Sequence, residues 1–162
     1  MPPIVSTIEI NRPPEDVFPY ATDPSRFAEW QNDVVSVRLA DDRPLGGGSR
    51  FIQTRRIGPG ERTMTMEITV NNPTGSWAAH GVDGPVRPRV KIAIEPLDGS
   101  TRSRVTFELD FEGHGIGVPL LPFIRRLAAN GAPKSYRNLK KRLESGDDRE
   151  ARDHNTRSSS GP

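Results

Sequence analysis

Signals for two short helices meet in the stretch Phe18-Pro-Tyr-Ala-Thr-Asp-Pro-Ser-Arg-Phe-Ala-Glu-Trp30, which ends in a tryptophan and is followed at once by strand-like sequence. Asp23 is a favourable helix cap, and Pro24 suits the first helical position, where a missing N–H costs nothing. Phe27 and Trp30 are three residues apart, so they share one face of a short helix. Because so brief a helix is not stable alone, its aromatic side chains must pack on a larger unit.

The length of 162 residues predicts a single domain with one sizeable core. We place this domain at residues 1–145. The remaining segment, 146–162, contains no apolar residue except Ala151. Such a segment cannot bury enough apolar surface to offset the entropy lost on ordering, so we predict a disordered polar tail.

The charge and residue composition exclude several classes of protein. The chain has 23 Lys and Arg against 21 Asp and Glu, a net charge of +2, which does not favour nucleic acid as a partner. The absence of cysteine excludes disulfides, thiol catalysis and cysteine-ligated metals. No apolar run approaches membrane-spanning length, so we expect no stable membrane insertion and a cytoplasmic location.

Alternation of apolar and polar residues predicts seven strands. They cover residues 4–10, 34–39, 49–57, 63–70, 76–82, 86–94 and 104–111. A helix is expected after the first strand, with Asn11 or Arg12 near its cap, and Pro19 should shorten or kink it. Most of the later strands are linked by tight turns such as Asp98-Gly99, which favours an antiparallel meander.

After Gly117 the apolar residues recur at the spacing of a helix instead of that of a strand. From Pro119 to Leu143 one apolar stripe recurs at helical spacing, and it comprises Leu120, Phe123/Ile124, Leu127, Gly131, Ser135, Leu139 and Leu143. The opposite face is basic, while Gly131 and Pro133 should bend the helix. The sequence therefore predicts an α+β fold in which a curved, seven-stranded antiparallel sheet wraps around a long C-terminal helix, with two short helices after the first strand.

Several short motifs in this order carry a family resemblance. They are Pro14-Glu-Asp-Val-Phe18, Asp23-Pro-x-x-Phe-x-x-Trp30, Gly48-Ser-Arg-Phe51, Ile94-Glu-Pro-Leu97, Arg104-Val-Thr-Phe107 and Asn138-Leu-Lys-x-x-Leu-Glu144. Over about residues 4–145 the chain resembles the START-like (SRPBCC) superfamily, the polyketide cyclase/dehydrase and lipid-transport family with the helix-grip fold. The resemblance implies a cavity between sheet and long helix for an apolar small molecule such as a lipid, sterol or polyketide. It implies no particular reaction, and no catalytic set transfers to this sequence.

The residues themselves show no catalytic or metal constellation. The histidines are His80, His114 and His154, too few without cysteines for a zinc site. A Gly-x-Ser-x-Gly nucleophile elbow is absent. Gly113-His-Gly-Ile-Gly117 lacks the Lys-Ser/Thr of a phosphate-binding P-loop and is interpreted as a hinge before the long helix. We therefore predict no metal and no cofactor, and leave catalytic residues unassigned.

Candidate ligand-binding residues come from the faces that should line the cavity. Gln53 shares a strand face with Phe51, and a buried amide needs a partner from protein, water or ligand, so Gln53 is the best candidate for orienting a polar substituent. Trp30 is either a core plug or a ligand-stacking ring. His114 either lies at the cavity mouth or is a plain loop residue.

Strand parity decides between two further side chains. Trp77 and His80 point to opposite faces of one strand, and we expect Trp77 to face the cavity. Met64 and Met66 form either an adaptable lining or plain core. Two further candidates are Phe107, which faces inward, and Phe123, which lies on the helical stripe.

The sequence leaves two main functions open. The first is binding of an apolar small molecule in the cavity by a monomer or homodimer. The alternative is a polyketide cyclase or dehydratase acting in the same cavity, with Gln53, His114 or an inward Arg or Asp handling protons. A third, an interaction module such as a chaperone co-factor, would be marked by an exposed apolar patch outside the cavity, and the sequence shows no clear patch of this kind. The basic helix face is either a solvated surface or a weak contact for anionic membrane or an acyl carrier protein.

Overall fold

The computed structural model of the protein describes residues 2–158, with side chains over residues 2–145. The elements are β1 (Ile4–Ile10), α1 (Pro14–Ala21), the 3-10 turn η1 (Pro24–Arg26), α2 (Phe27–Trp30), β2 (Val34–Leu39), β3 (Arg50–Ile57), β4 (Gly60–Asn72), β5 (Ser76–Gly81), β6 (Val86–Leu97), β7 (Arg102–Gly113), the 3-10 turn η2 (Gly115–Leu120) and α3 (Leu121–Ser158). The backbone of α3 runs to Ser158. The predicted disorder of 146–162 concerns residues whose side chains lie outside the described part, and it stays a prediction.

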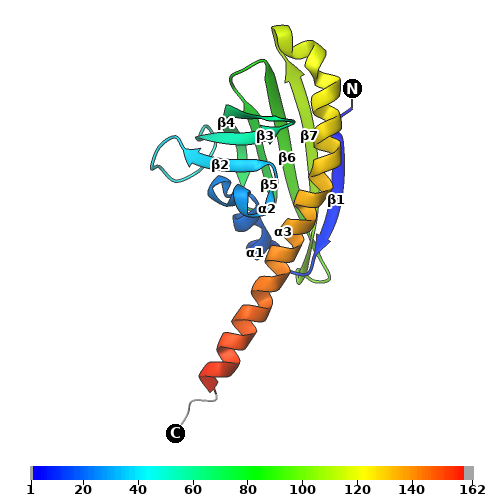
Figure 1. Cartoon of the computed structure of the whole chain (residues 1–162). Coiled ribbons are helices and arrows are strands. Elements are labelled where there is room, and N and C mark those ends of the chain that lie inside the picture. The colour runs from blue at the N-terminus through cyan, green and yellow to red at the C-terminus, as the bar shows by residue number, and fades with distance from the viewer. Residues whose placement is uncertain (1, 159–162) are drawn as a thin grey trace.

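All seven strands form one antiparallel sheet in the order β1-β7-β6-β5-β4-β3-β2. Strands β2 to β7 are a meander, while β1 joins at the far edge beside β7, with Ile4 opposite Leu109 and Ile10 opposite Ser103. Figure 1 shows the sheet curving around one side of α3, with α1 and α2 near one end of the sheet. This arrangement confirms the predicted α+β helix-grip fold.

The strand boundaries follow the alternation in the sequence, with three strands longer than predicted. β4, β6 and β7 extend by several residues because backbone pairing continues beyond the alternating apolar residues, as in the pairs Ile57–Gly60 and Leu97–Arg102. At the β6–β7 turn, Asp98 and Gly99 have φ of 50° and 66°. Asp and Gly tolerate this left-handed conformation, so the dipeptide identified in the sequence makes the expected hairpin turn.

The helix after β1 begins later than predicted. Its N-cap is Pro13 rather than Asn11 or Arg12, and no side chain caps it. The physical reason is that Pro13 precedes Pro14 and is held extended, with ψ of 155°, so the helix cannot begin before Pro14. In η1 the prediction is confirmed, because the Asp23 side chain accepts a hydrogen bond from Ser25 N at 3.0 Å.

The apolar stripe on α3 is buried over only part of its predicted length. Ser135, Leu139 and Leu143 are buried, whereas Leu120 and Phe123 are exposed. The stripe sets which face can be buried, but only the neighbouring elements decide where it is covered. The helix runs through Gly131 and Pro133 without interruption. Among the described residues, no helix combines the length and apolar character needed to cross a membrane.

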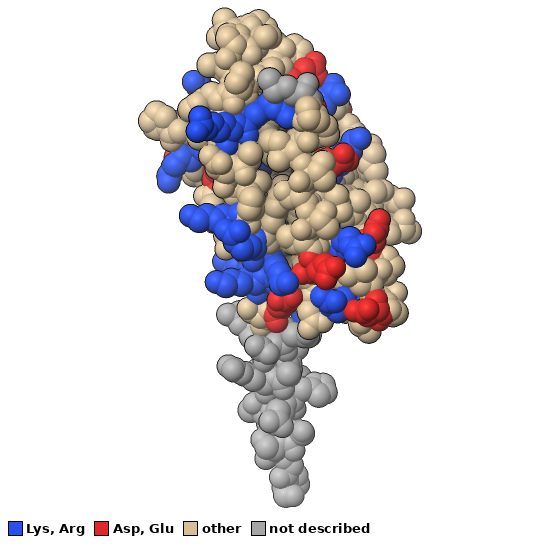
Figure 2. Space-filling view, turned by 90° about the vertical axis from the view of Figure 1, so that its right-hand side faces the viewer, with Lys and Arg blue, Asp and Glu red and all other residues tan. Residues whose placement is uncertain are grey.

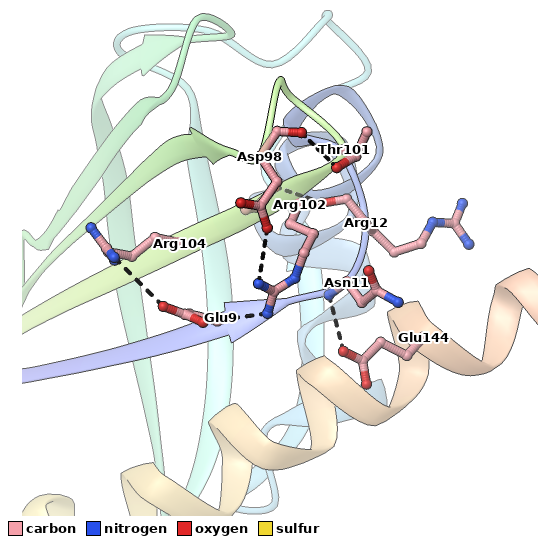
Figure 3. A network of polar contacts seen from close by, with 9 residues as sticks. Glu9, Asn11, Arg12, Asp98, Thr101, Arg102, Arg104 and Glu144 are labelled. Atoms are coloured by element: carbon pink, nitrogen blue, oxygen red, sulfur yellow. Dashed lines mark hydrogen bonds and ion pairs between the residues drawn. The ribbon is translucent and has the colours of Figure 1, made fainter.

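A polar network joins the β6–β7 turn to β1 and to α3 (Figure 3). Arg102 contacts Glu9 at 3.3 Å and Asp98 at 3.2 Å. The backbone N–H of Asn11 donates to Glu144 Oε1 of α3 at 3.0 Å. Each exposed ion pair contributes little stability alone, but together the contacts fix where α3 lies against this end of the sheet.

Candidate functional site

An aromatic cluster fills the space between the sheet, α2 and α3 near α1. The ring of Phe27 lies edge-on to three others, with centroid distances of 5.9 Å to Trp30, 5.8 Å to Phe51 and 6.0 Å to Trp77. Such T-shaped pairs stabilise a core beyond simple area burial. The short helix α2 therefore docks through Phe27 and Trp30, as the opening stretch of sequence requires.

Phe107 continues this cluster towards α3. Its centroid lies 6.2 Å from that of Trp30, and it stacks on Tyr136 of α3 at 3.8 Å with an interplanar angle of 9°. Four predicted ligand-binding aromatics, Trp30, Phe51, Trp77 and Phe107, are thus brought together and buried. As the structure stands, their rings pack on one another.

The side chains on the inner face of the sheet and on α3 become less buried from the α1 end of the molecule towards η2. On β7, Val105 and Phe107 are buried, while Leu109 and Phe111 are only half-buried. On β4, Met66 is buried and Met64 is half-buried. Side chains of α3 show the same gradient, ending at Phe123, which is 54% exposed. The grip is therefore tightly packed at the α1 end and incompletely covered at the η2 end.

Gln53 lies on the inner face of β3, directly opposite Met64 of β4, and its neighbour on the same face, Phe51, lies opposite Met66. The Gln53 side chain is 2% exposed, as its inward strand phase predicts. Its Oε1 is buried without a hydrogen-bond partner in the described part of the chain. A buried amide oxygen left without a partner costs about 1–3 kcal/mol, so an orphan of this kind marks a site where a further group is expected to bind.

Arg55 stands two residues after Gln53 on the same face of β3, and two hydrogen bonds hold its side chain in place. Its Nη2 donates to Gln31 Oε1 at 2.5 Å and its Nη1 to Asp33 Oδ2 at 2.9 Å. Burial raises the pKa of Tyr136 to about 12, and the nearby Arg55 guanidinium partly opposes that rise. Tyr136 is consequently a neutral hydroxyl, able to donate a hydrogen bond, throughout the physiological pH range.

The other predicted site residues lie apart from this group. His114 Nε2 is 3.0 Å from Glu112 Oε1, on the outer face of the sheet. Hydrogen bonding from Arg89 lowers the pKa of Glu112 below its usual range, and His114 adds to the effect. Phe123 lies at the η2 end, close to Gly58 of the β3–β4 turn. The predicted orientation of Trp77 is confirmed, since it is buried while His80 lies outside, 3.7 Å from Glu67.

Two hollows open to solvent are seen elsewhere on the surface. One, of about 320 Å3, is lined by Trp77 together with residues of α1, Leu45, Asn71 and Pro73. The other, of about 300 Å3, lies on the outer face around His80, Arg89 and Glu112. Within the described residues, no three His, Asp or Glu side chains are grouped so that they could hold a metal ion.

Three residues that shape the site were not singled out from the sequence: Gln31, Arg55 and Tyr136. Arg55 carries a readable signal, because it stands two residues after Gln53 and must share its face. Tyr136 stands three residues before Leu139 of the helical stripe, which also places it inward. Gln31 has no such signal, because it lies in the loop after α2 and reaches Arg55 only through the tertiary fold.

The fold agrees with comparisons to known proteins. Residues 1–144 match the model of a protein family that is described as "Polyketide cyclase / dehydrase and lipid transport". No curated protein matches the chain.

Solved structures show the same architecture at low sequence identity. The Zhui aromatase/cyclase from Streptomyces sp. R1128 has a TM-score of 0.74 and 13% identity, over 88% of this chain and 93% of that one. A START superfamily protein from Mycobacterium smegmatis has a TM-score of 0.74 and 16% identity, over 90% and 99% of the two chains. For the di-domain ARO/CYC BexL the TM-score is 0.69 at 16% identity; 89% of this chain is covered, and it spans only 47% of that chain.

At these identities the solved structures show the fold alone, whereas the family match extends over nearly the whole chain and agrees with the sequence motifs. This chain therefore belongs to the polyketide cyclase/dehydrase and lipid transport family.

Proposed function

We propose that the protein binds an apolar, ring-containing small molecule against the inner face of the sheet, and that the Gln53 amide orients the ligand. The observation that carries the proposal is the buried Gln53 Oε1, which has no hydrogen-bond partner within residues 2–145. A ligand hydroxyl would supply the missing donor, and the adjoining aromatic rings and methionines would contact its apolar body. The family match supports the class of ligand but not its identity.

The η2 end is the side from which such a ligand would enter. Phe123 is exposed and Met64 is half-buried, so both can move without breaking the packed cluster around Phe27. Methionine side chains adapt readily to ligands of different shape. The candidate set therefore divides by role: Gln53, Met64 and Phe123 would contact the ligand first, while Trp30, Phe51, Met66, Trp77 and Phe107 would form the wall behind it. His114, paired on the outer face, would have no direct contact.

The proposal is tested with two probes of similar shape, 2-naphthol and 2-methylnaphthalene, which differ in the hydroxyl donor. Binding is followed by quenching of tryptophan fluorescence, since Trp30 and Trp77 lie in the cluster wall. We expect the wild-type protein to favour 2-naphthol about tenfold, the contribution of one hydrogen bond to a buried amide. Gln53→Met should abolish that preference while retaining binding of 2-methylnaphthalene.

Native mass spectrometry of freshly purified protein complements this measurement by detecting a co-purifying ligand. The proposed function would be contradicted if neither probe quenched the fluorescence at the highest concentration at which it dissolves and the measured mass matched that of the bare chain. Equal loss of both probes in Gln53→Met would contradict the role of the amide alone.

A cyclase or dehydratase is the second candidate, and the pair Arg55 and Tyr136 favours it. The guanidinium of Arg55 is held by Gln31 and Asp33, and the Tyr136 hydroxyl is neutral, so both could stabilise a developing enolate oxygen. A substrate carried by an acyl carrier protein would fit this role. The test is turnover of a poly-β-keto thioester, which Tyr136→Phe and Arg55→Gln should slow without weakening 2-naphthol binding.

A further inference from the structure

A cluster of exposed apolar side chains protrudes at the η2 end. We call it the apolar tip, and it consists of Ile116, Val118 and Leu120 of η2 and Phe123 of α3, which are 78%, 54%, 46% and 54% exposed. These are four of the eight large hydrophobic side chains exposed in the described chain, which are Val5, Val35, Leu39, Val70, Ile116, Val118, Leu120 and Phe123. Single exposed hydrophobic residues are ordinary, but four within eight positions indicate an interaction surface.

The backbone under the apolar tip is fixed against the β5–β6 turn. The N–H of His114 donates to the Pro85 carbonyl at 2.8 Å, and Gly117 N donates to His114 O at 3.0 Å. Gly117 approaches so closely that a Cβ there would lie 1.8 Å from Pro85 O. Because the segment is anchored on both sides of Ile116, its side chains cannot turn inward to escape water.

Two arginines lie on the side of the apolar tip that faces the β3–β4 turn. Arg126 follows Phe123 by one helical turn, and Arg62 stands beside the β3–β4 turn that Phe123 approaches. Both are exposed, and neither pairs with a carboxylate among the described residues, whereas the nearby Glu61 is paired with Arg56 at 3.8 Å. In Figure 2 the uppermost part of the molecule is free of charged side chains, and both basic and acidic side chains lie directly below it.

We propose that the apolar tip docks reversibly on an anionic lipid surface. A protruding apolar segment flanked by Arg62 and Arg126 matches such a surface, where apolar side chains enter the acyl boundary and cations meet the headgroup phosphates. A second copy of the chain is a poorer occupant, because two tips would bring like charges together. This docking does not depend on the proposed ligand or on Gln53.

Co-sedimentation of the full chain with lipid vesicles tests the proposal. The protein is mixed with vesicles of phosphatidylcholine alone or of phosphatidylcholine with phosphatidylglycerol, at low and high salt. We expect binding to the anionic vesicles that weakens with salt, and Ile116→Ser to lower the partition coefficient about tenfold through lost apolar burial. Arg126→Gln should lower it about fivefold on anionic vesicles and leave binding to neutral vesicles unchanged.

Matched controls use residues of the same kind away from the tip. Val5→Ser removes a side chain that is 55% exposed, and Arg38→Gln removes an exposed arginine of β2. Neither should change vesicle binding, and thermal unfolding should show that all four variants fold. The proposal is overturned by wild-type protein that stays in the supernatant with anionic vesicles, or by equal losses in Val5→Ser and Ile116→Ser. It is also overturned if analytical ultracentrifugation shows self-association that Ile116→Ser abolishes, or if an acidic carrier protein binds the tip while vesicles do not.

Discussion

Replacing Gln53 by methionine should make the ligand-free protein more stable, although the mutation removes a polar group at the centre of the proposed site. The Gln53 side chain is 2% exposed and its Oε1 has no hydrogen-bond donor among the described residues, so no described protein group replaces the hydration that this oxygen loses on folding. The cost of such a group is about 1–3 kcal/mol. Methionine has nearly the same length and volume, so it should recover that cost without leaving a cavity.

The assay is urea unfolding of protein freed of bound small molecules by unfolding and refolding. We expect the free energy of unfolding to rise by about 1–3 kcal/mol, with a rise in Tm of roughly 2–4 °C per kcal/mol for a chain of this size. Gln31→Met is the matched control. It removes an amide whose Oε1 accepts a bond from Arg55 at 2.5 Å, and it should lower the free energy of unfolding by about 1 kcal/mol.

Replacement of glutamine by methionine should therefore raise the free energy of unfolding at position 53 and lower it at position 31. A loss of 1 kcal/mol or more in Gln53→Met would refute the reasoning, because it would mean that the amide already has a partner in the ligand-free protein. A gain in both variants would refute it equally, since stability would then follow hydrophobicity rather than hydrogen bonding.

Three further outcomes are expected. Trp30→Ala should lower the free energy of unfolding by about 3–5 kcal/mol in urea, because the ring is buried against Phe27; a much milder loss coupled with altered probe uptake would instead mark the ring as a gate. The pKa of Tyr136 is raised to about 12 from an unfolded value of 10.0, so its contribution to stability is complete below pH 10 and is lost as pH rises to 12. Over that window the free energy of unfolding of the wild type should fall by about 2–3 kcal/mol relative to that of Tyr136→Phe. Parallel curves of stability against pH for the two proteins would contradict the raised pKa. Gly117→Ala should cost at least about 2 kcal/mol in thermal unfolding because its methyl group would overlap the Pro85 carbonyl; an unchanged Tm would show that η2 can move away from the β5–β6 turn.

The sequence allowed most of the architecture to be predicted because local signals agreed with the tertiary fold. The period-two alternation placed Gln53 and Trp77 on the inner face, and both are buried there. Asp23 caps η1, and Asp98-Gly99 makes the β6–β7 turn, because each acts within a few residues. The ligand-binding role of these residues stays a prediction.

The local signals failed where burial depends on distant elements. Phe123 and Leu139 share one helical stripe, yet Phe123 is exposed and Leu139 is buried, because α1 and α2 lie beside the middle of α3 and not beside its first turns (Figure 1). The bonds between Gln31 and Arg55 join segments 24 positions apart, and no periodicity reports such a contact. The start of α1 was placed too early because Asn11 is a good capping residue, whereas the extended Pro13 before Pro14 delays the helix.

The pairing of β1 with β7 has a consequence for how this chain folds. The meander from β2 to β7 is built from neighbours in sequence, so each hairpin closes a short loop. β1 must instead wait for a partner about 100 positions away, since Ile4 pairs with Leu109, and closing so long a loop carries a larger entropic cost. The sheet edge beside β7 is therefore completed late, and a nascent chain that has not yet synthesised β7 carries an unpaired first strand rich in β-branched residues. The rate of folding should be governed by this one long-range pairing rather than by the helices that lie between its two strands.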